Sequence, residues 1–463
     1  LVFVATQHDS VYAVDADLGV QVWTVSFLST NVTTVPYTDV GSSDITPEIG
    51  ITSTPVIDPA AQILYVLAKT KEGPGPAYTY VQRLHALDLA TGAEMLGGPV
   101  VIQASVPGTG DGSVGGVVSF DPLRNGQRSA LLLLGGTLYI AWASHGDTPI
   151  YHGWVMGYDA HTLSQVSVWC ASPNNPTAGS TPGQAAIWMD GGGLATDGTF
   201  LYFSTGNGYF DANSLSASNT EYGDSFVKLS TAGGSLVVAD YFTPFNQASL
   251  SSGDLDLGSG GVVLLPDQGG AHPHLMLGGG KQALIYLIDR DNLGQFNAST
   301  DQVVQTVDLA ALGITYTPIS PSTGTAPGIF STPAYFNGTI YYKPAAPDVS
   351  VNCASPLLAF PVSGGLLSTS PIQSSPTWGW PGSTPSISAN GVANGIVWAL
   401  DVGPALTNAV LHAFKASDLT ELYNSTQNAG DALGKGVKFT VPTVANGKVY
   451  VGTAATLAIY GLK

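Results

Sequence analysis

A strand–turn–strand pattern recurs along the 463-residue chain, and this repetition constrains the fold more than any other feature of the sequence. Each copy has alternating apolar and polar residues, then an aspartate or another small polar residue, then a turn marked by glycine or leucine. Alternation with a period of two is typical of β-strands. Eight copies are found at spacings of roughly 45 to 75 residues, and they begin at Val11, Leu84, Val155, Phe226, Ile285, Leu357, Leu411 and Leu457.

Two further strand signals accompany many of the copies. A Ser-Thr-Pro segment begins at Ser53, Ser331 and Ser383, and proline suits the first residue of a strand. An apolar run, such as residues 63–67, lies between this segment and the next copy. Each unit is therefore expected to have four antiparallel strands. Radial packing of such sheets is favoured, because an isolated sheet would leave edges and a face exposed.

The sequence thus predicts an all-β fold, a β-propeller of four-stranded antiparallel blades in which residues 1–463 form a single domain. Eight blades are expected, with seven as the alternative. Two or three β-sandwich domains are disfavoured, because sandwiches do not repeat one turn sequence. The first copy shows no first strand and the last copy no fourth strand. Self-association through the edges of these terminal blades is therefore a further hypothesis.

Charge and composition exclude several classes of partner. The chain has a net charge of −18 and only 14 lysines and arginines, so a polyanion such as DNA or RNA would be repelled. No apolar run is long enough to predict a membrane span. The chain begins at Leu1 rather than at a methionine, which is consistent with a processed, secreted or extracellular protein.

Glycosylation and disulfide formation are the covalent modifications that the sequence suggests. Four N-x-[ST] sequons predict a glycoprotein, at Asn31, Asn297, Asn337 and Asn424. Two cysteines lie far apart in the sequence, Cys170 and Cys353, and the pattern leaves open whether they form a disulfide or two buried thiols. Two cysteines alone cannot form a thiolate zinc cluster.

A motif block between Trp188 and Gly294 carries the strongest family resemblance. It reads IWMDGGGLATDG, then STGNG, GDS, GDLDLG and finally KQALIYLIDRDNLG. In this order the motifs resemble those of the quinoprotein alcohol dehydrogenases, eight-bladed propellers that use pyrroloquinoline quinone (PQQ). The whole chain also resembles a group of secreted PQQ-like repeat proteins.

The resemblance implies roles for five residues. Trp188 would be the platform under the quinone ring, and Lys281 would donate to the quinone oxygens. Calcium would be bound by Asn207, Asp254 and Asp256, which offer the hard oxygen ligands that this ion prefers. Asp254 would also be the general base that takes the proton of a small alcohol or carbohydrate substrate.

The sequence departs from the family pattern in three ways. The family's adjacent cysteine pair is absent, and no C-x-x-C-H haem motif exists. The family's metal-binding glutamate would fall near Asp147 or Thr148. Whether the chain is an enzyme is therefore left open by the sequence.

Other residues and other functions also fit the pattern. His145, His152 and Asp147 together suit a transition metal or base chemistry, or hydrogen bonding within a loop. Trp378 and Trp380 suit sugar stacking or the docking of one blade on the next. Three functions follow: a PQQ- and calcium-dependent dehydrogenase, a non-catalytic extracellular binding or self-assembling propeller, and a propeller hydrolase or lyase.

Overall fold

The computed structural model describes residues 1–174, 184–212, 220–315, 317–318, 328–345, 353–403 and 407–461. The chain divides into two compact units. The first comprises Leu1–Trp188, Thr196–Ala239 and Asn246–Asp254, and the second comprises Met189–Ala195, Asp240–Phe245 and Leu255–Lys463. The single domain expected for residues 1–463 stays a prediction.

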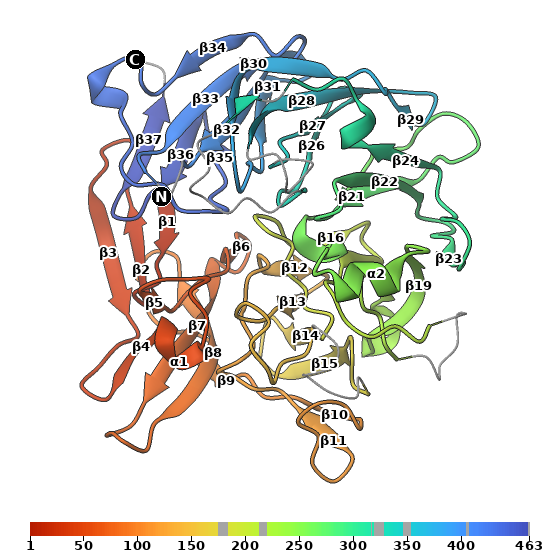
Figure 1. Cartoon of the computed structure of the whole chain (residues 1–463). Coiled ribbons are helices and arrows are strands. Elements are labelled where there is room, and N and C mark those ends of the chain that lie inside the picture. The colour runs from red at the N-terminus through yellow and green to blue at the C-terminus, as the bar shows by residue number, and fades with distance from the viewer. Residues whose placement is uncertain are drawn as a thin grey trace. The chain divides into compact units, whose positions relative to one another are not determined.

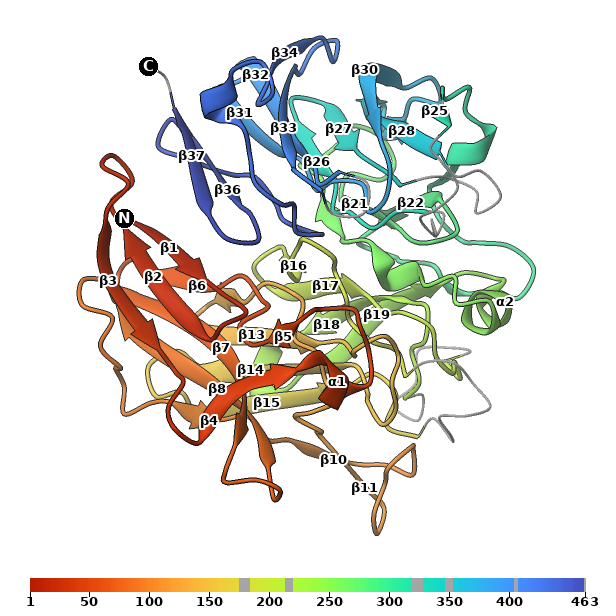
Figure 2. The same cartoon turned by 60° about the vertical axis from the view of Figure 1, so that its left-hand side comes forward.

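The first unit begins with a three-stranded sheet of β1 (Val2–Ala5), β2 (Ser10–Val14) and β3 (Gln21–Ser26) (Figure 1). The second sheet contains β4 (Val32–Pro36), β5 (Glu48–Ile49), β6 (Val56–Asp58), β7 (Ile63–Glu72), β8 (Thr79–Asp88) and β9 (Val100–Val101). The third contains β12 (Leu132–Leu134), β13 (Thr137–Trp142), β14 (Trp154–Asp159) and β15 (Gln165–Cys170). A hairpin of β10 (Ser105–Pro107) and β11 (Val117–Ser119) projects from this unit in both views (Figure 2).

The fourth sheet contains β16 (Ala195–Thr196), β17 (Phe200–Ser204), β18 (Phe226–Ser230) and β19 (Val237–Thr243), and β23 (Gln295–Phe296) lies parallel to the end of β19. Helices are short. The first unit contains α1 (Tyr37–Val40), α2 (Gln247–Ser252) and the 3-10 turn η1 (Ala232–Gly234). In the described part of the chain, no helix is long and apolar enough to cross a membrane.

The second unit contains four more sheets. The fifth sheet has β20 (Val263–Leu264), β21 (Leu275–Gly279), β22 (Leu284–Asp289) and β24 (Gln305–Asp308). The sixth has β25 (Thr317–Pro318), β26 (Ala334–Phe336), β27 (Thr339–Tyr342), β28 (Cys353–Ser363), β29 (Leu366–Leu367) and β30 (Ile372–Trp378). The seventh has β31 (Ser386–Asn390), β32 (Ala393–Asp401), β33 (Val410–Lys415) and β34 (Glu421–Asn424).

The eighth sheet has β35 (Thr443–Ala445), β36 (Lys448–Gly452) and β37 (Leu457–Gly461). Three 3-10 turns complete the second unit, η2 (Leu257–Ser259), η3 (Leu309–Ala311) and η5 (Ala429–Asp431). The predicted fold class is confirmed, because the chain is an eight-bladed β-propeller that is nearly all β. The prediction that every blade has four strands is only partly right. The first and last sheets have three strands, and insertions add strands to the second and sixth.

The strand register explains why the sequence repeat is so regular. The second strands of different blades pair with the third strands at equivalent positions, Tyr65 with Ala86 and Tyr139 with Gly157. An aspartate follows two residues later in each case. Asp88 Oδ1 accepts hydrogen bonds from the backbone N–H groups of Ala90 and Thr91, and Asp159 does the same one blade later. The repeated aspartate therefore closes the turn through its side chain.

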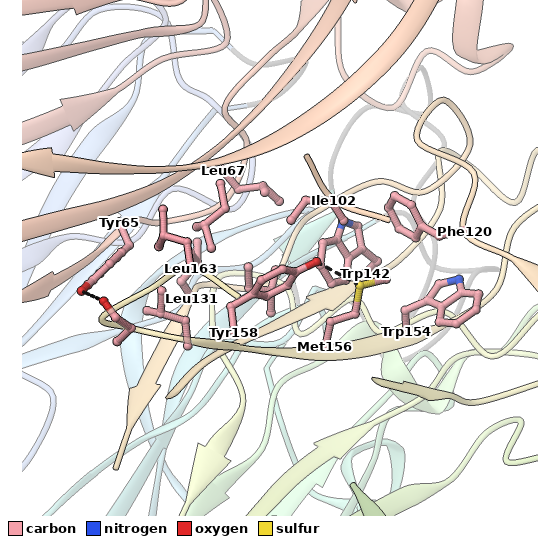
Figure 3. Close-up of a cluster of buried hydrophobic side chains, with 14 of the residues drawn as sticks. Tyr65, Leu67, Ile102, Phe120, Leu131, Trp142, Trp154, Met156, Tyr158 and Leu163 are labelled. Atoms are coloured by element: carbon pink, nitrogen blue, oxygen red, sulfur yellow. Dashed lines mark hydrogen bonds between the residues drawn. The ribbon is translucent and has the colours of Figure 1, made fainter. Parts of the chain in front are cut away.

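At two junctions, neighbouring blades are joined by a tyrosine hydroxyl that reaches the turn of the next blade. Tyr65 Oη donates to the carbonyl oxygen of Ala160 at 2.7 Å, as Figure 3 shows. In the second unit, Tyr341 occupies the same repeat position and donates to the carbonyl oxygen of Ala416 at 2.8 Å. Each bond is buried, and a buried carbonyl that lost it would remain desolvated without a partner.

Two histidines also contact the preceding blade, in this case by aromatic stacking. His85 contacts Glu94 at 2.8 Å and stacks on Phe27 of the preceding blade, with ring centroids 3.7 Å apart. His412 contacts Glu421 at 2.6 Å and stacks on Trp378 of its preceding blade. Large aromatic side chains fill the space between blades, and Trp142 and Trp154 are fully buried with Phe120 against them (Figure 3). Stacking therefore adds to burial at these junctions.

Removing the tyrosine hydroxyl tests this docking. We expect Tyr65→Phe and Tyr341→Phe each to lower the free energy of unfolding by about 1–3 kcal/mol, because a buried carbonyl loses its donor. Urea denaturation followed by tryptophan fluorescence measures the change. Tyr450→Phe is the matched control, because Tyr450 lies at the same register position of the eighth sheet and its hydroxyl makes no hydrogen bond within the described residues of the second unit. Equal stability of all three variants would contradict the docking role.

Candidate functional site

Trp188 and Asn207 lie on adjacent, hydrogen-bonded segments of the first unit. The backbone N–H of Ala185 donates to the carbonyl of Asn207 at 2.9 Å, and the N–H of Gly206 donates to the carbonyl of Ala186 at 2.8 Å. This close approach requires the glycine after Asn207, since a Cβ at Gly208 would lie 2.8 Å from the nitrogen of Ala185. The motif order seen in the sequence thus corresponds to a real spatial neighbourhood.

Helix α2 brings Asp254 to Asn207. Two of its side chains clamp Gly208, with Gln247 Nε2 donating to its carbonyl at 2.8 Å and Ser251 Oγ accepting from its N–H at 3.2 Å. Asp254 follows the helix in a left-handed conformation, with φ +53°. Its Oδ1 lies 3.4 Å from Nδ2 of the buried Asn207. Strained backbone of this kind is common where a side chain must point in a fixed direction.

Trp188 has a fixed cation against its ring. The guanidinium carbon of Arg128 lies 5.4 Å from the ring centroid, within the range of a cation–π contact. Asp44 holds that guanidinium, with Oδ2 3.3 Å from Nη1. The indole packs against Ala143 and Tyr151 on its partly buried side. The predicted platform is therefore an aromatic surface next to a positive charge.

A line of buried polar groups continues behind Asp44. The same Oδ2 atom accepts from His145 Nδ1 at 3.2 Å, and His145 Nε2 lies 2.8 Å from Lys69 Nζ. Lys69 also donates to the carbonyl oxygens of Leu123 at 2.7 Å and Asn125 at 3.3 Å. Burial lowers the pKa of Lys69 to about 7. Burial and the neighbouring Lys69 charge lower the pKa of His145 to about 4, so its ring is neutral near pH 7.

The second unit holds the other two predicted residues as an ion pair. Lys281 Nζ lies 2.6 Å from Asp256 Oδ2, and both side chains are largely buried. The backbone N–H of Lys281 also donates to the carbonyl of Asp256 at 2.9 Å. The structure therefore joins Trp188, Asn207 and Asp254 in the first unit, and Asp256 with Lys281 in the second.

Lys69 was missed by sequence reasoning, although a signal for it was present. It lies four residues after Tyr65, which pairs with Ala86. Lys281 lies four residues after Leu277, which pairs with Leu287 at the equivalent register position. The two lysines therefore occupy the same place in the repeat, and aligning the blades by register would have found both.

The remaining candidates have structural partners. Asp147 Oδ1 bonds Ser144 and Tyr151, and His152 contacts Ser172 Oγ and the carbonyl of Asp111. Among the described residues, no group of three or more His, Cys, Asp or Glu side chains is placed to hold a metal ion.

Trp378 and Trp380 pack against other aromatic side chains, and Cys170 is buried. Trp378 stacks on His412 and Trp380 lies edge-on to Phe330, so both pack between strands. Cys170 is a free, buried thiol whose pKa is raised by burial. The side chain of Cys353 lies outside the described residues.

The donor set fits a quinone and a calcium ion in chemical type. Asn207 and Asp254 offer an amide oxygen and carboxylate oxygens from positions that already touch, and calcium prefers such ligands. Trp188 with Arg128 offers a flat apolar face and a positive charge, which match a planar anion. At the position of the family's glutamate, Asp147 is already bonded to Tyr151 at 2.6 Å.

Comparison with known proteins is informative at the level of the fold. No protein-family model and no curated protein sequence matches the chain. The structure is similar to a quinohemoprotein alcohol dehydrogenase from Pseudomonas putida HK5, with a TM-score of 0.58, 15% identity, and coverage of 97% of this chain and 67% of that one. The quinohemoprotein alcohol dehydrogenase from Comamonas testosteroni gives a TM-score of 0.56, 15% identity, and coverage of 97% and 68%. The expected resemblance to the quinoprotein superfamily is confirmed in the fold.

Asp9 is a further buried acid that the sequence did not single out. It lies between β1 and β2 with no exposed surface, and neither carboxylate oxygen has a hydrogen-bond partner among the described residues. Gly50 packs directly against it, since a Cβ there would lie 2.8 Å from Asp9 Cγ. Burial raises the pKa of Asp9 from 3.8 to about 8; the nearby backbone N–H of Lys69, which does not reach full hydrogen-bond geometry with the carboxylate, opposes the rise, and the charge of Glu48 adds to it.

This burial predicts a pH dependence of stability. The raised pKa means that the folded state favours the protonated acid, so the contribution of Asp9 to stability is lost as pH rises from about 4 to about 8. We expect Asp9→Asn to remove this fall, so that the variant gains stability relative to the parent at pH 8 but not at pH 4. Urea titrations at both pH values measure the difference. The exposed Asp17→Asn is the control, and an unchanged pH profile in Asp9→Asn would refute the prediction.

Proposed function

We propose that this chain is a quinoprotein-type dehydrogenase that binds PQQ with calcium and oxidises a small alcohol or sugar. The observation that carries the proposal is the neighbourhood in the first unit. A tryptophan with a fixed cation lies on a segment hydrogen-bonded to that of Asn207, which contacts Asp254. The shared fold with quinohemoprotein alcohol dehydrogenases supports it.

The chain's own residues would divide the work. PQQ, when bound, supplies a hydride acceptor. Trp188 would stack against its ring and Arg128 would pair with an anionic group at the ring edge. Asn207 and Asp254 would offer oxygens to calcium. Asp254 would take the proton of the substrate hydroxyl at a carboxylate oxygen, which is general-base catalysis.

Lys281 and Asp256 differ from the residues of the first unit, because they already form an ion pair with each other. Their roles by resemblance, donation to the quinone oxygens and calcium ligation, stay predictions. The 2.6 Å contact between them means that each charge is already compensated by the other. This contact favours a second candidate function, a non-catalytic propeller that binds its ligand without turnover. Hydrolase or lyase activity and self-association through terminal blade edges stay predictions as well.

One titration separates these functions. We expect purified protein to bind PQQ in the presence of Ca²⁺, with quenching of tryptophan fluorescence, and to reduce an artificial dye when given an alcohol or sugar. Asp254→Asn should lower turnover at least about 100-fold while PQQ binding persists, as expected on loss of a general base. Trp188→Ala should weaken binding of PQQ.

The control and the contrary outcomes are defined by the same titration. Trp169→Phe is the matched control, because this tryptophan packs on Phe203 in the same unit, and it should change neither property. Binding of PQQ without turnover would establish the non-catalytic alternative. Absence of PQQ binding in the parent protein would reject the proposed dehydrogenase.

We also propose that the chain is secreted and glycosylated. Three of the four sequon asparagines, Asn31, Asn297 and Asn337, are exposed, which is where a glycan can be carried. We expect the protein isolated from its source to lose mass on enzymatic removal of N-linked glycans, and the Asn297→Gln variant to lose one glycan. A mass equal to that of the bare chain would contradict this.

A further inference from the structure

Of the line of buried polar groups behind Trp188, only Arg128 has a role in the function proposed above. It runs from Lys69, which is 4% exposed, through His145, which is 1% exposed, to Asp44 and Arg128. The partners come from three separate parts of the first unit, the strand β7, the loop after α1 and the loops on either side of β12 and β13. Burial of such a charged network costs free energy of folding, because each charge loses its hydration.

The protonation state of Lys69 determines which atom donates in each hydrogen bond from Lys69 through His145 to Asp44. Lys69 donates to two backbone carbonyls and, when charged, to His145 Nε2. His145 must then carry its proton on Nδ1, which points to Asp44 Oδ2. Asp44 in turn holds Arg128 against Trp188. The charge on Lys69 thus fixes the histidine tautomer, and through it the carboxylate that positions Arg128.

The charges around Lys69 leave a local excess of positive charge. Its charge is influenced by the carboxylates of Asp121 and Asp44 and by the guanidinium of Arg124. Asp9 lies near its backbone N–H and is protonated below about pH 8. With Arg128, this centre of five named groups has three cations and two carboxylates, whose formal charges sum to +1 while Lys69 is protonated. The whole chain has a net charge of −18, so this centre opposes the general field of the molecule.

We infer that Lys69 is a specificity-determining residue, which acts through His145, Asp44 and Arg128 to make the Trp188 face of the first unit prefer an aromatic anion over a neutral aromatic ligand. Lys69 and His145 are positioning residues, since neither touches the Trp188 ring. The inference rests on the proposed function only for the identity of the natural ligand.

The preference should depend on pH. As pH rises through about 7, Lys69 loses its proton and the net charge of the centre falls to zero. An anion bound at Trp188 stabilises the protonated lysine, so its affinity decreases over the same range. A neutral ligand does not respond in this way. One pKa unit of such coupling equals about a tenfold change in affinity.

A matched pair of probes tests the inference without PQQ. Naphthalene-2-carboxylate and naphthalene-2-carboxamide differ in charge and are nearly identical in shape. By isothermal titration calorimetry, we expect the parent protein to bind the carboxylate about tenfold more tightly at pH 6 and less than about threefold more tightly at pH 8. Lys69→Met should show a small preference that is the same at both pH values.

The controls separate this result from general effects. Lys71→Met removes another cation of β7, one paired with Asp39 at 2.7 Å, and should keep the parent's preference and pH dependence. If Lys69→Met does not fold, as judged by circular dichroism, two other measurements test the inference. Arg128→Gln should lose the preference for the carboxylate, and the preference of the parent protein should fall between pH 6 and pH 8. Equal affinities of the parent for the two probes, or an unchanged preference in folded Lys69→Met, would overturn the inference. Failure of PQQ to bind while the probe preference persists would reject the proposed function alone.

Discussion

The packing of neighbouring blades depends at two junctions on the same hydrogen bond, from a tyrosine hydroxyl in one blade to a backbone carbonyl beside the turn of the next. Tyr65 and Tyr341 make this bond from equivalent register positions in the two units. A blade is a small sheet that buries its faces only against its neighbours, so a directional contact between neighbours fixes how they pack. In the first unit, Asp159 holds the accepting carbonyl of Ala160 in place, because its side chain closes the turn that carries this carbonyl.

The repetition was predictable because its causes are local. Strand alternation, the turn aspartate and the proline at a strand start are each visible within a few residues, and together they predicted eight antiparallel blades. The extra strands were not predictable in the same way. Strand β4 joins the second sheet by pairing with the long strand β7, and β5 joins it by pairing with β4; the sequence between β4 and β5 carries no repeat signal.

In the candidate site too, residues within short motifs were predictable from the sequence, whereas contacts between distant residues were not. Trp188, Asn207 and Asp254 lie in motifs that a family resemblance can recognise, and the structure brings these three together. The contact between Lys69 and His145 joins residues 76 positions apart. The sequence does not predict this contact, although His145 was a candidate beside Asp147 and His152, and burial is what changes the chemistry of both residues. A buried acid such as Asp9 is hidden from sequence analysis for the same reason, since its surroundings come from Gly50 and from another blade.

The tyrosine bond also bears on how such a chain can change over time. Its acceptor is a main-chain oxygen, and every residue type supplies one. The bond itself therefore does not depend on the residue type that supplies the carbonyl, although burial constrains the size of the side chains at Ala160 and Ala416. A propeller joined in this manner tolerates wide divergence of its blades, which accords with a fold shared at 15% identity. The same tolerance makes a single blade a unit that could be exchanged between distant propellers, provided that the tyrosine and the turn aspartate travel with it.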